Sequence, residues 1–210
     1  SRSETALHHS VTHLLHAALK EVLGSHVKQA GSLVTSQRLR FDYTHFSPLV
    51  LGEKNRIEER VNQKIRENLK VSTNELSIEK AIKDGAVALF GEKYGENVRV
   101  VSMGDFSKEL CGGTHTAATG NIGLFKIISE GGIASGVRRI EAVAGKSAYS
   151  AMQEENKTLI SIRSLLKVSP EEEINRVKKI LEKSRAMEKE IGHLKEKLIS
   201  GKGSNLENEI

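Results

Sequence analysis

The chain has 210 residues, enough to bury one sizeable core with an appendage, and its net charge is +5 at neutral pH. Hydrophobic residues make up 38% of it, and no apolar run approaches the roughly 20 residues that a membrane span needs. The single cysteine and the absence of a signal-peptide core indicate a cytoplasmic protein. The charge excess is small for a dedicated nucleic-acid-binding protein, and eight aromatic residues (five Phe, three Tyr) are few for a surface that stacks single-stranded RNA.

Residues 5–23 are predicted to form the first helix, because apolar side chains recur at helical spacing, and Gly24 is expected to end it. Residues 31–34 and 38–42 resemble two strands of a hairpin. Their alternation places Leu39 and Phe41 inward and leaves Arg38 and Arg40 on the outer face.

The middle of the chain alternates between helical and extended patterns. A surface helix is predicted at 57–69 and a third helix at 77–90, with Leu89 on its buried side and Gly91 at its end; a short strand follows near 98–101. Two further strands, 124–129 and 136–143, are joined by a glycine-rich turn at 130–135. We therefore expect an α+β fold with a mixed, largely antiparallel sheet covered by helices.

From Gly145 the composition changes to long charged helices, so the domains are expected at 1–145 and 146–200, with a frayed tail at 201–210. Two apolar stripes mark the helices. The first contains Met152, Leu159, Ile162 and Leu166, and the second runs through Val177, Ile180, Ser184, Met187, Ile191, Leu194 and Leu198. Helices with such stripes and a short connection are expected to pack as an antiparallel hairpin, and the second stripe also favours self-association.

Two pairs of side chains with a four-residue spacing predict a metal site. His9 and His13 would project from one face of the first helix, so that both imidazoles can reach a single ion. Cys111 and His115 repeat the spacing with the only cysteine and another histidine. A thiolate with imidazoles is the ligand set that Zn²⁺ prefers, so a shared Zn²⁺ is expected.

Other interpretations of these residues remain open. Cys111 can be a buried free thiol that packs as a small hydrophobe, or a nucleophile that accepts an acyl group. If all four side chains bind, the site is closed, and catalysis requires a fifth ligand or the release of one of the four. A peptidase helix would need glutamate directly after the first histidine, where Ser10 stands, so a metallopeptidase is not favoured.

Five motifs resemble, in order, the editing domain of alanyl-tRNA synthetase. They are HSVTHLLH at 9–16, QAGSLV at 29–34, LRFD at 39–42, ELCGGTH at 109–115 and GVRRIE at 136–141. The resemblance covers about residues 1–145. It implies a zinc-dependent hydrolase that removes wrongly attached serine or glycine from the acceptor end of tRNA(Ala). The aminoacylation motifs are missing, so the chain is expected to be a fragment of a longer enzyme.

Thr12 precedes His13 on the same helix, and its hydroxyl is a candidate for recognising serine, as is the Gln29 amide at a position that the resemblance indicates. Thr12 bonded to its own helix and Gln29 capping a turn are the structural alternatives. Arg38, Arg40, Arg138 and Arg139 are candidate tRNA contacts. A non-catalytic tRNA-binding module with structural zinc, and a scaffold that dimerises through its helices, are the competing functions.

Overall fold

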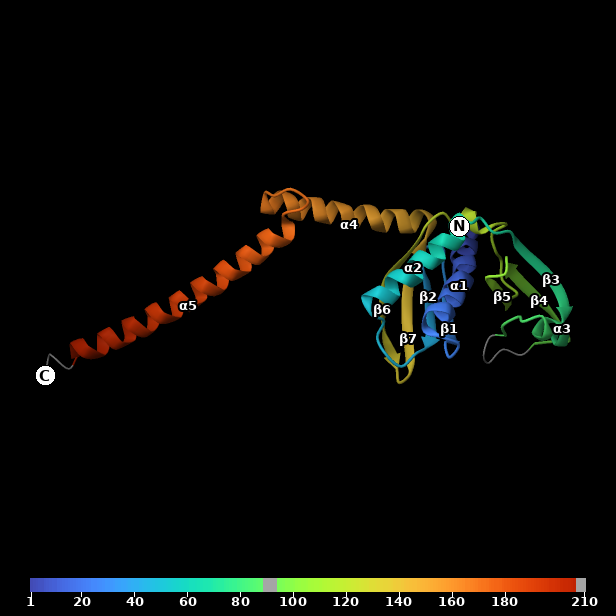
Figure 1. Cartoon of the computed structure of the whole chain (residues 1–210), viewed down its shortest axis with the longest axis horizontal. Helices are drawn as coiled ribbons and strands as arrows, with labels where there is room; N and C mark the ends of the chain where they lie inside the picture. Colours follow the sequence, from blue (N-terminus) through green and yellow to red (C-terminus); the bar gives the residue numbers. More distant parts are fainter. Residues whose placement is uncertain (89–93, 207–210) are drawn as a thin grey trace. The chain divides into compact units, whose positions relative to one another are not determined.

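The computed structural model describes residues 1–88 and 94–206, with side chains to Ile199, and shows an α+β fold (Figure 1). The expected Leu89 and Gly91 positions lie outside the described residues. The elements are α1 (Arg2–Leu23), β1 (Gln29–Val34), β2 (Leu39–Thr44), α2 (Leu51–Arg66), β3 (Val71–Ser77), α3 (Ile78–Lys83), β4 (Asn97–Met103), β5 (Ser107–Leu110), a 3-10 helix η1 (Thr119–Ile122), β6 (Phe125–Ala134), β7 (Val137–Ala144), α4 (Gly145–Leu166) and α5 (Glu173–Leu206).

The larger sheet has the strand order β1-β2-β7-β6, and every neighbouring pair is antiparallel. Helix α1 contacts β1, β2 and β7, while α2 contacts α1 and β6, so both helices cover the same sheet (Figure 1). Leu39 and Phe41 are fully buried, as the predicted alternation requires. Ile57, Val61 and Ile65 are the buried residues of α2 and complete the layer between helices and sheet.

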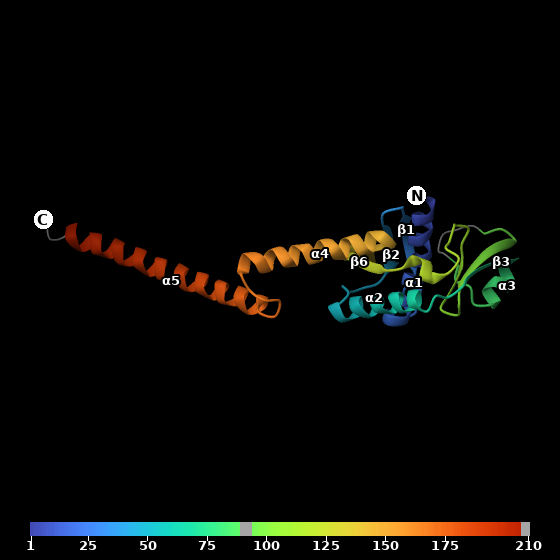
Figure 2. The same cartoon turned by 90° about the horizontal axis from the view of Figure 1, so that it is seen from above.

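The remaining strands form a second sheet, so the expected single sheet is two antiparallel sheets. Its order is β3-β4-β5, and α3 contacts β3 and β4. Figure 2 shows α3 beside β3. Strand β3 was not predicted, because its sequence VSTNELS has no apolar alternation and its side chains are at most half-buried. Helix α3 ends at Lys83 instead of extending toward residue 90, and its Ile82 is 55% exposed.

The glycine-rich segment is mostly strand. Strand β6 continues to Ala134 and pairs with β7 through irregular register at Gly132, which leaves a tight connection at Gly136 with φ +69°. The segment expected to be a turn at 130–135 is therefore largely the end of β6. A glycine relieves the steric cost of this positive φ.

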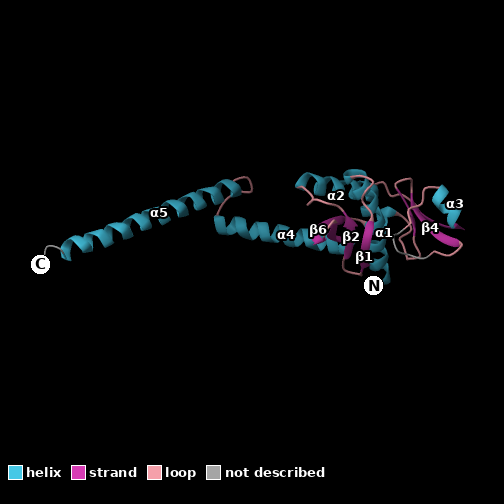
Figure 3. Cartoon of the chain, turned by 90° about the horizontal axis from the view of Figure 1, so that it is seen from below, coloured by secondary structure: helices cyan, strands magenta, loops and turns pink. Residues whose placement is uncertain are grey.

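The chain divides into two compact units, 1–152 and 153–210. Figure 3 shows α4 and α5 as the two long C-terminal helices, which confirms the expected pair. Arg163 of α4 forms an ion pair with Glu173 at the start of α5. Leu159 and Ile162 remain 44% and 42% exposed, as does most of the α5 stripe, so the expected packing of one stripe on the other is not found among residues 153–199. No helix in the described part of the chain is both long and apolar enough to span a membrane.

Candidate metal centre

Helix α1 presents two of the candidate ligands. Residues four apart lie on one face of a helix, and the ring centroids of His9 and His13 are 5.3 Å apart. The opposite faces of α1 carry Leu14 and Leu15, which are fully buried in the core. This burial fixes the rotation of the helix about its axis, so the two histidines have a defined direction.

The other two candidate ligands come from the loop that follows β5. The Cys111 sulfur lies 3.4 Å from Nε2 of His9 and 3.4 Å from Nε2 of His115. Arg99 of β4 holds this loop by donating to the carbonyl oxygens of Gly112 and Gly113 at 2.9 Å and 2.5 Å. The ligand atoms of all four candidate residues lie within 4.8 Å of one another.

The arrangement fits a metal ion. Zn–N bonds of about 2.0 Å and Zn–S bonds of about 2.3 Å place two tetrahedral ligands roughly 3.5 Å apart. The sulfur-to-nitrogen distances of 3.4 Å match this separation. Nε2 of His13 is buried and has no hydrogen-bond partner among the described residues. A buried polar nitrogen without a partner is costly, and a cation that takes the place of its proton among the four side chains would satisfy it.

Glu109 orients His13 from outside this group. One carboxylate oxygen of Glu109 lies 2.7 Å from Nδ1 of His13, and the other lies 2.9 Å from Nδ1 of His16. All three side chains are buried, between 3% and 5% exposed. Because Nδ1 donates a hydrogen bond to the carboxylate, the His13 ring presents Nε2 toward the other ligands, and Nε2 becomes a ligand atom when an ion displaces its proton.

The charges of the centre are mutually stabilised. Burial opposes the Cys111 thiolate, but the neighbouring imidazoles of His115, His13 and His9 outweigh it and lower the pKa of Cys111 to about 3. Burial likewise lowers the pKa of His13, whereas the charge of Glu109 and contact with Cys111 raise it to about 10. Cys111 is therefore a thiolate at neutral pH, and a cation that binds here displaces a proton from His13.

His115 is held by Ser10, between the helix histidines. The Ser10 oxygen lies 3.3 Å from Nδ1 of His115 and accepts the Thr116 amide proton at 3.0 Å. Burial lowers the pKa of His115 more than its contact with Cys111 raises it, so the ring is neutral and can act as a ligand.

Sequence reasoning missed Glu109, His16 and Ser10 as supports of the centre. His16 stands three residues after His13, on a neighbouring position of the same helix face, and this spacing is a usable signal. Glu109 lies 96 residues from His13 in the chain, and only the packing of β5 on α1 brings them together. Because β5 was not predicted, no pattern in the sequence indicated that Glu109 is buried.

Thr12 and Gln29 do not hydrogen-bond any of the four candidate ligands within the described residues. The Thr12 hydroxyl donates to the His8 carbonyl at 2.8 Å and is buried. This is the bond to its own helix that the structural alternative expects, and it leaves the oxygen free to accept a hydrogen bond. Gln29 opens β1 opposite Tyr43 and is half-buried. Their role in recognition stays a prediction.

The four candidate tRNA-binding arginines all have acidic neighbours. Arg139 is paired with Asp42 through two hydrogen bonds of 2.7 Å and 2.8 Å, and Arg138 with Glu130 in the same two-pronged way. Arg38 and Arg40 have looser partners, Glu141 at 3.6 Å and Asp42 at 3.9 Å. A phosphate would have to compete with these carboxylates, most strongly at Arg138 and Arg139.

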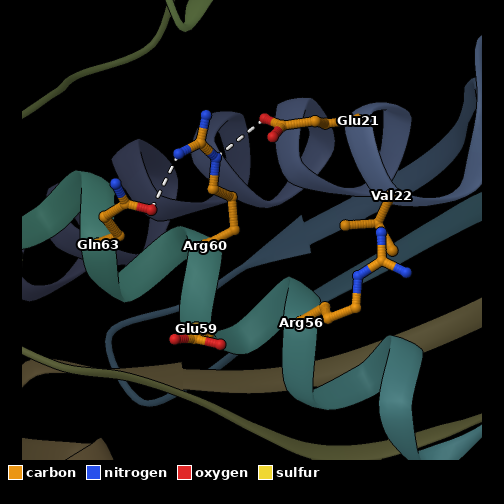
Figure 4. Close-up of a pocket in the computed structure, with 6 residues that line it drawn as sticks. All are labelled: Glu21, Val22, Arg56, Glu59, Arg60 and Gln63. Carbon is orange, nitrogen blue, oxygen red and sulfur yellow. Dashed lines mark hydrogen bonds and ion pairs between the residues drawn. The ribbon is translucent and has the colours of Figure 1, made fainter.

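Of two surface cavities in the first unit, one borders the candidate metal centre and the other does not. One of about 470 Å³ borders His115 and is lined by Arg2, Ser3, Ala6, Leu7, Thr114, His115, Thr116 and Asn121. The other, about 200 Å³, lies between α1 and α2 and contains no candidate ligand; there Arg60 bonds Glu21 and Gln63 (Figure 4). The cavity beside His115 borders one of the four candidate ligands, so a small group bound in it would lie next to the centre.

Replacing Glu109 with glutamine should weaken metal binding by about 10-fold to 100-fold, the usual cost of losing a partner that orients a ligand. The side-chain volume is kept, but the amide cannot accept from both His13 and His16. Competition with a chromogenic chelator measures the affinity. Glu75→Gln, at an exposed position of β3, serves as the control. An unchanged dissociation constant for Glu109→Gln would contradict the orienting role.

Comparison with known proteins identifies the family. Residues 98–141 match the family described as threonyl and alanyl tRNA synthetase second additional domain. The alanine–tRNA ligase of Xanthomonas axonopodis pv. citri is 51% identical over 98% of this chain, and that of Halorhodospira halophila is 52% identical over 98%. The chain spans only 23% and 24% of these two relatives. The chain thus belongs to the alanine–tRNA ligase family and corresponds to the region that contains the editing domain.

Proposed function

We propose that the chain hydrolyses mischarged tRNA(Ala), cleaving the ester that joins serine or glycine to the terminal ribose. The observation that carries this proposal is the convergence of His9, His13, Cys111 and His115 in a chain of this family. The proposed ion is Zn²⁺, because three imidazoles and a thiolate form a ligand set suited to it. We further propose that the reaction takes place in the cytoplasm, with the acceptor end of tRNA(Ala) as partner.

Bound Zn²⁺ would supply Lewis acidity that polarises the ester carbonyl. The residues of the chain supply the rest. His9 and His13 from α1, with Cys111 and His115 from the loop, would hold the ion, while Glu109 and Ser10 fix the rings of His13 and His115. An aminoacyl ester is already activated relative to an amide, so correct positioning of water against the carbonyl carries much of the rate enhancement.

Thr12 and Gln29 are proposed to distinguish serine from alanine, which differ by one hydroxyl. Thr12→Val keeps the side-chain shape and removes the hydroxyl, and Gln29→Leu removes the amide. Each change should lower the preference for Ser-tRNA(Ala) over Ala-tRNA(Ala) by about tenfold, the value of one neutral hydrogen bond of about 1.4 kcal/mol. The ratio of kcat/KM for the two substrates measures the preference. The same ratio in both variants as in wild type would exclude these residues from recognition.

Hydrolysis of Ser-tRNA(Ala), Gly-tRNA(Ala) and Ala-tRNA(Ala) by the purified chain tests the proposed function. We expect release of serine and glycine well above the spontaneous rate and little release of alanine. A zinc-loaded chain that binds tRNA(Ala) but leaves all three esters intact would instead establish the competing function, a non-catalytic tRNA-binding module with a structural metal.

A further inference from the structure

An exposed aromatic cluster lies at the end of the larger sheet, away from the metal centre. Phe46 follows β2 and is 82% exposed. Its ring centroid lies 4.7 Å from that of His45 and 5.2 Å from that of His26, and the two histidine rings stack at 5.1 Å. Few aromatic residues are present in the chain, yet three rings meet at this point.

The cluster is held in place from beneath. His45 is buried and its Nδ1 lies 2.8 Å from Nε2 of His26, while its backbone amide donates to the Gly136 carbonyl at 3.0 Å. Nε2 of His45 lies 3.3 Å from the Ser47 hydroxyl. These bonds fix both imidazoles, so Phe46 rests on an ordered support while most of its own surface faces solvent.

We propose that Phe46, supported by His45 and His26, is a stacking platform for an unpaired nucleobase of the bound tRNA. Exposing a phenyl ring to water is unfavourable, and a base stacked on its free face removes that cost. Imidazole and phenyl rings are among the side chains on which proteins stack unpaired RNA bases. The exposed ammonium of Lys28, close in the chain to His26, adds a positive charge suited to the adjoining phosphate.

The position of the platform suits a nucleotide upstream of the terminal one. At one end of β7, the Ala144 amide donates to His8, the residue before the candidate ligand His9. Just before the other end of β7, the Gly136 carbonyl accepts from the His45 amide. The intervening strand of 8 residues is roughly 25 Å long. If the 3′ end of an RNA strand lies at the metal centre, the nucleotide that reaches the platform is therefore several positions before that 3′ end. In this respect the inference rests on the proposed function.

Four variants test the platform with uncharged tRNA(Ala) as the probe. Phe46→Ala should raise the dissociation constant of the full chain for tRNA(Ala) by about 5-fold to 100-fold, the range expected for one base–aromatic stack. Phe46→Leu retains apolar area without an aromatic face and should lose affinity similarly, whereas Phe46→Trp should restore it. Tyr149→Ala removes another exposed aromatic ring, 59% exposed on α4, and should leave affinity unchanged. Thermal melting verifies the fold of each variant.

Wild-type affinity in Phe46→Ala would overturn the platform, as would full affinity in Phe46→Leu, which would indicate an apolar contact such as one with a protein surface. Absence of measurable tRNA binding by wild type would overturn it as well. The proposed function is judged separately by hydrolysis. If wild type binds tRNA(Ala) but leaves Ser-tRNA(Ala) intact while Phe46→Ala binds weakly, the hydrolase proposal fails and the platform stands.

Discussion

Cys111→Ser is expected to lose most of its bound zinc and to lower kcat/KM for Ser-tRNA(Ala) by more than about 100-fold. Losing a residue that only orients a ligand costs about 10-fold to 100-fold in affinity or activity, so losing a ligand should cost more. The thiolate is also the only anionic donor of the four, and it neutralises part of the positive charge of the ion. Metal content by mass spectrometry and single-turnover hydrolysis on the same samples measure both losses.

Cys111→Asp separates a ligand from a nucleophile. Its carboxylate can bind zinc but lacks the thiol that an acyl-enzyme mechanism would need. We expect it to retain more zinc and more activity than Cys111→Ser. A zinc-loaded Cys111→Asp protein without any activity, together with an acyl group trapped on Cys111 in wild type, would assign the cysteine to nucleophilic catalysis and contradict the ligand role.

Gly113→Ala is expected to disrupt the centre as severely, although it removes no functional group. A Cβ atom at Gly113 would lie 1.9 Å from Cε1 and 2.4 Å from Nδ1 of His9, far inside van der Waals contact. The ring of His9 is one of the four candidate ligands, so it would have to leave its position or push the loop away. We expect zinc content and deacylation to fall by more than about 100-fold, because displacing a ligand should cost more than the roughly 10-fold to 100-fold of losing a residue that only orients one.

Gly112→Ala is the matched control, because a Cβ atom at Gly112 meets nothing within 4 Å. The two variants differ by one position and carry the same added methyl group, so any general effect on loop entropy is shared. Gly112→Ala should retain zinc and activity. Equal behaviour of the two variants would show that the approach of Gly113 to His9 does not determine the geometry of the centre.

Local patterns in the sequence were sufficient for much of the fold. The spacing of buried residues in α1 and α2 and the alternation in β2 predicted those elements, because each depends on neighbours within a turn or a strand. Strand β3 was not predicted because it covers no large core and because its paired residues in β4 lie 20 or more positions away in the chain. The division into two sheets was missed for the same reason, since it depends on which distant strands pair.

In the candidate site, too, the residues set by local spacing could be predicted from the sequence, and those set by tertiary packing could not. The four-residue spacings found all four candidate ligands, because each pair is set by local geometry. Their supports were not found, since Glu109 reaches His13 and His16 only through the tertiary packing of β5 against α1. The acidic partners of Arg138 and Arg139 also depend on strand register: Asp42 of β2 faces Arg139 of β7.

Zinc reconstitution tests the central claim most directly. The chain is stripped of metal with a chelator, its metal content is verified, and hydrolysis of Ser-tRNA(Ala) is followed as Zn²⁺ is added. Activity is predicted to be absent without metal and to rise to a plateau at about one equivalent of zinc per chain, as for a single four-ligand site. Full activity in the verified metal-free chain would contradict the proposal that His9, His13, Cys111 and His115 act through a bound ion.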